Sequence, residues 1–124
     1  MIVLKKLFFV PLILLFLCSC NVEKKSAEKN SAALSPGAVI IDVRSAEEFQ
    51  TGHVKGAINI PHTAIADKIA AAIPDQTTPI KLYCRSGRRV KLAMDELQKL
   101  NYSNLEDCGG INEAAQSLKL PIVQ

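Results

Sequence analysis

Short apolar runs that alternate with helical patterns most strongly restrict what this sequence can fold into. The apolar runs at 38–43, 57–60 and 80–84 are each long enough for one buried strand. Helical patterns follow two of these runs, at 64–73 and 88–100. Strands that alternate with helices predict an α/β domain with a mainly parallel central sheet flanked by helices.

The other segments of this domain carry local signals for their structure. Ser45 and Glu48 have the spacing of a capping box, which predicts a helical turn that begins at Ser45 and ends at Gly52. Residues 103–108 are expected to form a short strand, and residues 109–118 to turn and form the last helix. The helix at 88–100 is expected to bury one apolar face, made by Val90, Ala93, Leu97 and Leu100.

The first twenty residues have the organisation of a bacterial export signal. Lys5 and Lys6 precede an apolar stretch of eleven residues at 7–17, and Cys-Ser-Cys follows. Eleven residues are too few for a membrane-spanning helix, which needs about 20. A transmembrane anchor is therefore the weaker interpretation of this segment.

The sequence LCSC at 17–20 resembles a lipobox, the cleavage site of bacterial lipoproteins. The resemblance implies a signal peptide at 1–19 and a lipidated Cys20. The protein would then lie in the cell envelope, in the periplasm and anchored to a membrane. Plain secretion after cleavage nearby is the alternative. Residues 20–37 lack apolar periodicity, which predicts a flexible tether and leaves 38–124 for one small domain.

Charge and cysteine content argue against two classes of protein. The net charge is +3, and without Lys5 and Lys6 the remaining 13 basic and 12 acidic residues give +1. A nucleic-acid surface needs a strong basic excess. Two of the four cysteines belong to the export signal, so Cys84 and Cys108 are too few for a disulfide framework. The cysteine and histidine spacings do not fit zinc, so no metal site is expected.

A basic loop follows Cys84, the last residue of the third apolar run. A cysteine reacts as the thiolate, which nearby cations and helix N-termini stabilise. Both are expected here, because Gly87 to Arg89 should open the next helix and Arg85, Arg88 and Arg89 add positive charge. The pattern predicts an anion-binding loop around a reactive sulfur.

The length of this loop separates two chemistries. Tyrosine-phosphatase-like enzymes use Cys-x5-Arg, which would require an arginine where this chain has Val90. Arg89 closes a loop that is one residue shorter. A smaller ring of N–H groups fits a single sulfur atom better than a tetrahedral phosphate, so an arsenate- or phosphate-ester enzyme is disfavoured.

Three motifs in order resemble those of the rhodanese family. They are VIIDVRSAEEFQTGHVKGAINIPH at 39–62, LYCRSGRR at 82–89 and GGINEA at 109–114. The resemblance covers about 38–120. One departure is Ala114, because the family often has a tryptophan at that position.

The resemblance implies a thiosulfate sulfurtransferase, or rhodanese-like enzyme, that needs no metal or organic cofactor. Cys84 would take a sulfane sulfur from thiosulfate or a similar anion, become a persulfide, and pass the sulfur to a thiol or cyanide, or to an acceptor protein. A persulfide carrier with little turnover is a second interpretation. A thiol redox protein that uses Cys84 and Cys108 is a third. The loop would bind the substrate through Arg85, Ser86, Gly87, Arg88 and Arg89, and Arg89 has the alternative of pairing with a carboxylate.

The remaining polar residues of the motifs are interpreted as structural. Asp42 and Arg44 are expected to pair or to cap loops at strand ends, and His53 and His62 to make structural hydrogen bonds. Cys108 is either a buried thiol that ends a strand or a thiol that resolves the Cys84 persulfide, because both cysteines are expected at one edge of the sheet.

Overall fold

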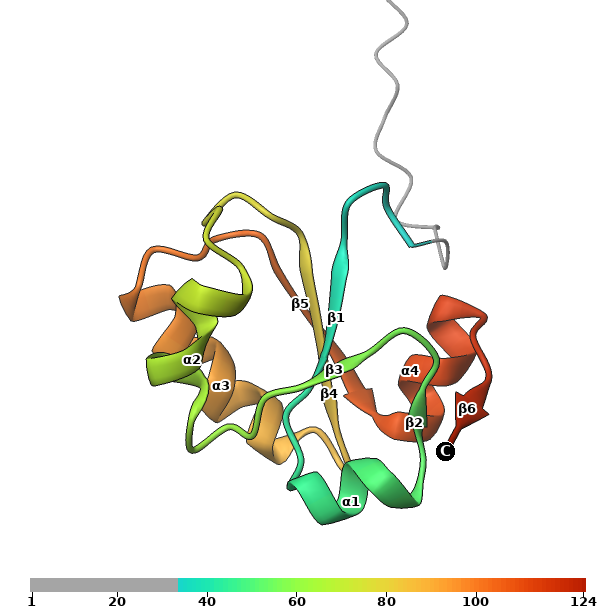
Figure 1. Cartoon of the computed structure of the whole chain (residues 1–124). Coiled ribbons are helices and arrows are strands. Elements are labelled where there is room, and N and C mark those ends of the chain that lie inside the picture. The colour runs from blue at the N-terminus through green and yellow to red at the C-terminus, as the bar shows by residue number, and fades with distance from the viewer. Residues whose placement is uncertain (1–33) are drawn as a thin grey trace, which may run out of the picture.

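A computed structural model describes residues 34–124, which form an α/β domain (Figure 1). The expected signal peptide at 1–19, the lipidation site Cys20 and most of the expected tether at 20–37 lie outside the described residues. Within the described part of the chain, no helix has both the length and the apolar character needed to cross a membrane.

Four parallel strands form the central sheet, as the sequence predicts. Their order is β3-β1-β4-β5, and each neighbouring pair is parallel. Strand β4 lies inside the sheet and is buried along its whole length, which explains why it is apolar except for Lys81, whose ammonium group pairs with Glu106 of β5. The bounds are Val39–Asp42 for β1, Ile58–Asn59 for β3, Ile80–Cys84 for β4 and Leu105–Gly110 for β5.

Helices cover both faces of this sheet (Figure 1). Helices α2 (Ile65–Ala72) and α3 (Arg88–Lys99) bury apolar residues in one core cluster, together with Cys84. Helix α4 (Ile111–Leu118) packs in a second cluster with Tyr83 and Cys108. The short helix α1 (Ala46–Thr51) has no buried residue.

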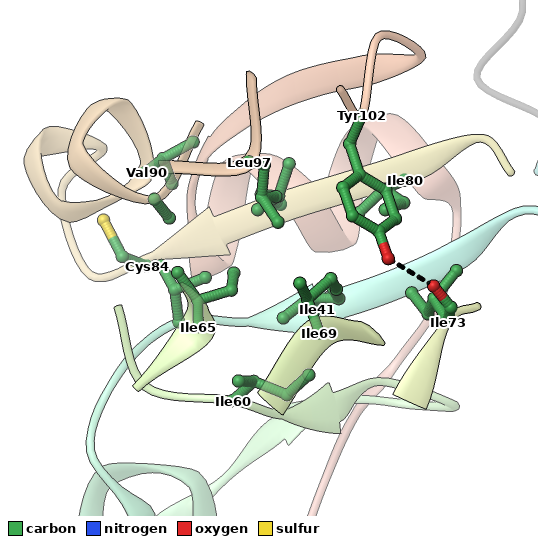
Figure 2. Packing of buried hydrophobic residues seen from close by; sticks show 13 residues of the cluster. Ile41, Ile60, Ile65, Ile69, Ile73, Ile80, Cys84, Val90, Leu97 and Tyr102 are labelled. Carbon is green, nitrogen blue, oxygen red and sulfur yellow. Dashed lines mark hydrogen bonds between the residues drawn. The ribbon is translucent and has the colours of Figure 1, made fainter. Parts of the chain in front are cut away.

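The first cluster fills the space between the sheet, α2 and α3 (Figure 2). Val90, Ala93 and Leu97 of α3 are fully buried there. The Tyr102 hydroxyl donates a hydrogen bond to the Ile73 carbonyl oxygen at 2.6 Å, which satisfies the polar end of a buried aromatic ring. The inclusion of Leu100 in this face is wrong, because Leu100 caps the end of α3 and is 36% exposed.

A second, two-stranded sheet was not predicted. Strands β2 (His53–Val54) and β6 (Ile122–Val123) pair antiparallel. Two residues are too short to show an alternating pattern, so the sequence gives no signal for either strand. The predicted strand at 103–108 is shifted, since β5 runs on through Gly109 and Gly110 to the start of α4.

Candidate active site

Cys84 is the last residue of β4, at the carboxyl end of the parallel sheet. It is 1% exposed and belongs to the first core cluster. Figure 2 shows its sulfur directed towards the start of α3, near Val90. The backbone N–H of Gly87 donates a hydrogen bond to this sulfur, with 2.9 Å between nitrogen and Sγ. The loop therefore curls back so that one of its own amides contacts the sulfur.

The conformation of Gly87 makes this contact available. Its φ is +92°, in the left-handed region that glycine adopts without a steric penalty, and it is the N-cap residue of α3. No side chain caps α3, so the first N–H groups of that helix have no side-chain acceptor at the N-cap. The positive end of the helix dipole lies beside the sulfur and favours a negative charge there.

The three arginines of the loop have two different environments. The guanidinium of Arg89 makes a bidentate pair with Glu48, with Nη1 2.7 Å from Oε2 and Nη2 2.9 Å from Oε1. Arg85 and Arg88 are exposed, and neither takes part in a salt bridge within residues 34–124. Two free guanidinium groups therefore lie in the loop, and the third is engaged with a carboxylate.

Glu48 belongs to α1 and also forms its cap. Its Oε2 accepts a hydrogen bond from the Ser45 backbone N–H at 3.0 Å, and the Ser45 hydroxyl oxygen accepts one from the Glu48 N–H. This confirms the capping box. Hydrogen bonding from Arg89 is the main reason that the pKa of Glu48 falls to about 2. The same pair raises the pKa of Arg89. The spacing of Ser45 and Glu48 in the sequence indicates the helix start, but not that Glu48 also pairs with Arg89.

Gly110 lies directly behind the cysteine loop. It pairs with Cys84 in the register of β4 and β5. A Cβ atom at this position would lie only 2.6 Å from the Arg85 carbonyl oxygen, and the space leaves room for glycine alone. Gly109 similarly lies close to Gly87, since a Cβ on Gly87 would contact the Gly109 Cα at 3.6 Å. A Gly-Gly pair is typical of a place where two backbones approach closely, but it does not indicate which segment lies opposite.

Asp42 and Arg44 form a buried pair at the end of β1. The Arg44 Nε lies 3.0 Å from both Asp42 carboxylate oxygens, and its Nη2 donates to the Gly52 carbonyl oxygen at 2.6 Å. Tyr83 lies beside this pair, with the Arg44 guanidinium carbon 5.8 Å from the centroid of its ring. The Tyr83 hydroxyl oxygen accepts a hydrogen bond from the backbone N–H of Val54. Their contacts are structural, as the sequence predicts.

The His53 side chain makes the expected structural hydrogen bond, whereas the hydrogen bond found for His62 in the described residues is made by its backbone. The His53 Nδ1 lies 3.0 Å from the Phe49 carbonyl oxygen, and the His53 ring stacks on the Phe49 ring at 3.8 Å between centroids. The backbone N–H of His62 donates to the Val43 carbonyl oxygen. In the part of the chain that the structure describes, no group of three or more His, Cys, Asp or Glu residues is placed to hold a metal ion.

Cys108 packs on the opposite face of the sheet from Cys84. It lies in the second core cluster with Tyr83, whereas Cys84 lies in the first. Burial is the main reason that the pKa of the Cys108 thiol rises to about 11, and both cysteines are free thiols. Both cysteines lie near the carboxyl ends of neighbouring strands, as expected, but their side chains lie on opposite faces of the sheet. Strand alternation explains the difference: Leu82 pairs with Asp107, so the next residue, Cys108, lies on the face of Tyr83, and Cys84 lies on the other face.

Comparison with known proteins gives one consistent match. A family model described as "Rhodanese-like domain" matches residues 24–115. The thiosulfate sulfurtransferase PspE of Escherichia coli (strain K12) is 41% identical over 75 residues, which are 60% of this chain and 72% of that protein. A tRNA uridine(34) hydroxylase of Erwinia tasmaniensis is 32% identical over 97 residues, but the chain spans only 28% of its length.

The fold is also shared with solved structures. A structure described as "rhodanese with anions from E. coli" has a TM-score of 0.64 and 38% sequence identity. The match covers 70% of this chain and 98% of the solved chain. The similarity therefore extends over nearly the whole of a protein that consists of one such domain.

Proposed function

The chain belongs to the rhodanese-like domain family, and we propose that it is a sulfurtransferase that carries sulfur on Cys84. The donor is thiosulfate or a similar sulfane-sulfur anion, and the acceptor is a thiol or cyanide. One observation carries the assignment to this residue: the Gly87 N–H donates a hydrogen bond to the Cys84 sulfur. The loop around it holds two arginines, Arg85 and Arg88, that form no salt bridge within residues 34–124. The identity of 41% to a protein named thiosulfate sulfurtransferase supports the choice of donor.

In the first half-reaction the Cys84 thiolate attacks the outer sulfur of thiosulfate. A sulfur–sulfur bond forms at Cys84, the bond between the two donor sulfurs breaks, and its electron pair leaves with sulfite. The three negative charges of thiolate and thiosulfate become the three of persulfide and sulfite. The Gly87 N–H and the N-terminus of α3 stabilise the persulfide anion, as an oxyanion hole stabilises oxygen.

In the second half-reaction the acceptor removes the outer sulfur. A thiolate or cyanide attacks this sulfur, the bond to Cys84 breaks, and the electron pair returns to Cys84 as thiolate. The product is an acceptor persulfide or thiocyanate. Two half-reactions through one covalent intermediate predict ping-pong kinetics.

The loop has charges suited to a small dianionic donor. Arg85 and Arg88 are exposed and unpaired in the described structure, so they attract the donor and hold its sulfonate oxygens. Ser86 and Gly87 supply the backbone between them. The 1% exposure of Cys84 favours a donor whose reacting sulfur projects from a small head group. Arg89 is engaged with Glu48, and its role is to hold the loop rather than the donor.

A mass measurement tests the first half-reaction. The purified protein is treated with thiosulfate, desalted and measured intact. A gain of about 32 Da, equal to one sulfur atom, is expected in the wild type and not in Cys84→Ser. An equal gain in both proteins would place the sulfur elsewhere and exclude Cys84 as the carrier.

Turnover separates an enzyme from a persulfide carrier. An enzyme forms thiocyanate continuously from thiosulfate and cyanide, whereas a carrier loads one sulfur and releases thiocyanate slowly. The thiol redox alternative lacks geometric support, because Cys84 and Cys108 lie in different core clusters.

The domain boundaries and the location follow from the sequence. We propose that residues 1–19 are removed on export, that acyl chains on Cys20 hold the protein to a membrane of the cell envelope, and that 20–37 tether the domain at 38–124. On detergent phase separation of cell extracts, the wild type should enter the detergent phase and Cys20→Ala the aqueous phase. Equal partitioning of both would contradict the anchor.

A further inference from the structure

The structure links the cysteine loop to helix α1 through one carboxylate. Gly87 donates to the Cys84 sulfur, and Arg89, two residues later, is fixed by both Glu48 oxygens. Glu48 is in turn held by the Ser45 capping box. A continuous series of hydrogen bonds therefore leads from the α1 cap to the first turn of α3, next to the amide that contacts the sulfur.

On the side of the loop that faces α1, few other contacts can fix the position of the Gly87 amide. No side chain caps the N-terminus of α3, and the other two loop arginines form no salt bridge within the described structure. The loop is supported from behind by the Gly109–Gly110 backbone. The Glu48–Arg89 pair is therefore the charged contact that supports the loop from its other side.

The geometry of the pair suits a positioning role. Two parallel N–H···O bonds fix the plane of the guanidinium as well as its distance from the carboxylate. The pair is partly buried, with side chains 23% and 29% exposed, so solvent screens it less than a surface ion pair. Arg89 lowers the pKa of Glu48 to about 2, so Glu48 stays ionised well into the acid range.

We propose that Glu48 is a positioning residue for sulfur transfer: by holding Arg89 it keeps the Gly87 N–H directed at Cys84, and it withdraws Arg89 from the anion that Arg85 and Arg88 attract. This inference rests on the proposed function for its catalytic readout. Its chemical readout, the alkylation of Cys84, does not depend on any sulfurtransferase activity.

The test compares two alkylating reagents on the full chain. Rates are measured separately on the Cys84 and Cys108 peptides by mass spectrometry, with neutral iodoacetamide and anionic iodoacetate. In Glu48→Ala, the neutral reagent should alkylate Cys84 about tenfold more slowly, because the amide no longer stabilises the thiolate. Glu48→Gln, which keeps the shape of the side chain, should lie between Glu48→Ala and the wild type.

The charge of the reagent tests the second part of the proposal. Release of Arg89 should raise the ratio of the iodoacetate rate to the iodoacetamide rate at Cys84, and Arg89→Gln in the Glu48→Ala background should return it to the wild-type value. Cys108 reports on the fold, because it is buried in the other cluster. Its alkylation should stay unchanged, and faster alkylation of Cys108 would show that Glu48 acts only through overall stability and overturn the proposal.

Glu47→Gln is the matched control. Glu47 is the exposed neighbour of Glu48 in the same first turn, and it makes no salt bridge to the loop in the described residues. In Glu47→Gln, Cys84 should be alkylated and sulfur transferred at the wild-type rates. A Glu48→Ala protein with wild-type alkylation of Cys84 would overturn the positioning role.

Steady-state kinetics then separate this inference from the proposed function. If the wild type transfers sulfur, kcat/KM for thiosulfate should fall about tenfold in Glu48→Ala, with the larger share in kcat. An unchanged kcat in Glu48→Ala would overturn the inference alone. If the wild type gains no sulfur and shows no turnover, the proposed function fails, and the alkylation rates still decide whether Glu48 positions the loop.

Discussion

Gly110 and Arg85 approach so closely that a Cβ atom on Gly110 would lie 2.6 Å from the Arg85 carbonyl oxygen. The two residues are far apart in sequence, and the register of β4 and β5 brings them together at the carboxyl end of the sheet. The backbone around Gly110 thus forms the rear wall of the cysteine loop. The shape of the loop depends on this wall as well as on its own sequence.

Gly110→Ala should therefore disturb both stability and sulfur transfer. The added methyl group collides with backbone rather than with a flexible side chain, so the loop or β5 must move. We expect a loss of roughly 1–3 kcal/mol in the free energy of unfolding, which urea denaturation measures, and a fall in kcat for thiosulfate.

Gly56→Ala is the control for this substitution. Gly56 has a φ of +85°, and no atom lies within 4 Å of the place that an alanine methyl group would take, so alanine adds backbone strain without a collision. It should cost about 1 kcal/mol of stability and leave kcat unchanged. Equal kcat in both variants would contradict a rear-wall role for Gly110.

Arg85→Ala and Arg88→Ala should each raise the KM for thiosulfate, by about threefold to tenfold. Each removes a charge that attracts the dianion and that forms no salt bridge in the described part of the chain. The effect should shrink as salt is added, since salt screens exposed charges. Initial rates at several ionic strengths check this. Lys91→Ala removes an exposed charge of the same sign from the next turn of α3 and should change KM less. Equal effects from all three would mean that net charge, not the loop, draws the donor.

The Glu48–Arg89 pair should make stability depend on acid. The pKa of Glu48 is lowered from 4.5 to about 2 in the folded protein, so the contribution of its charge is present above pH 4.5. This contribution is lost as the pH falls from 4.5 towards 2. In urea denaturation, the gap between the wild type and Glu48→Gln should therefore be widest above pH 5 and close on acidification. A gap that is independent of pH would show that the pair contributes through shape alone.

Cys108→Ser should leave sulfur loading at Cys84 intact, because the two thiols lie on opposite faces of the sheet. The hydroxyl is buried among apolar side chains, so stability should fall by about 1–3 kcal/mol. Intact mass after thiosulfate treatment and urea denaturation measure the two effects. If a folded Cys108→Ser protein did not gain the mass of one sulfur, Cys108 would have to take part in sulfur transfer after all.

The sequence predicts those features of the fold that depend on neighbouring residues. The apolar runs predict the strands of the central sheet, and the spacing of Ser45 and Glu48 predicts the cap of α1. The end of β4 at Cys84 and the start of α3 at Arg88 follow from a change of pattern within a few residues. These signals are local, so one sequence is enough to read them.

Features that depend on distant backbone could not be predicted in the same way. The register of β5 is one such feature: Leu82 pairs with Asp107, which places Cys108 on the face opposite Cys84. An extra residue near Gly109, whose φ is +73°, then brings Gly110 opposite Cys84. A glycine pair indicates irregular backbone, but not how it changes the strand register. The partner of Arg89 is likewise set by how α1 lies against α3, which no spacing in the sequence encodes.

The register of β5 against β4 also bears on how the protein would tolerate oxidants. It places the Cys108 thiol on the face of the four-stranded sheet opposite Cys84, where apolar side chains bury it. Within residues 34–124, no second thiol is then placed to attack the Cys84 persulfide and form an intramolecular disulfide. Persulfide made under oxidising conditions would stay on the domain until an outside acceptor arrives.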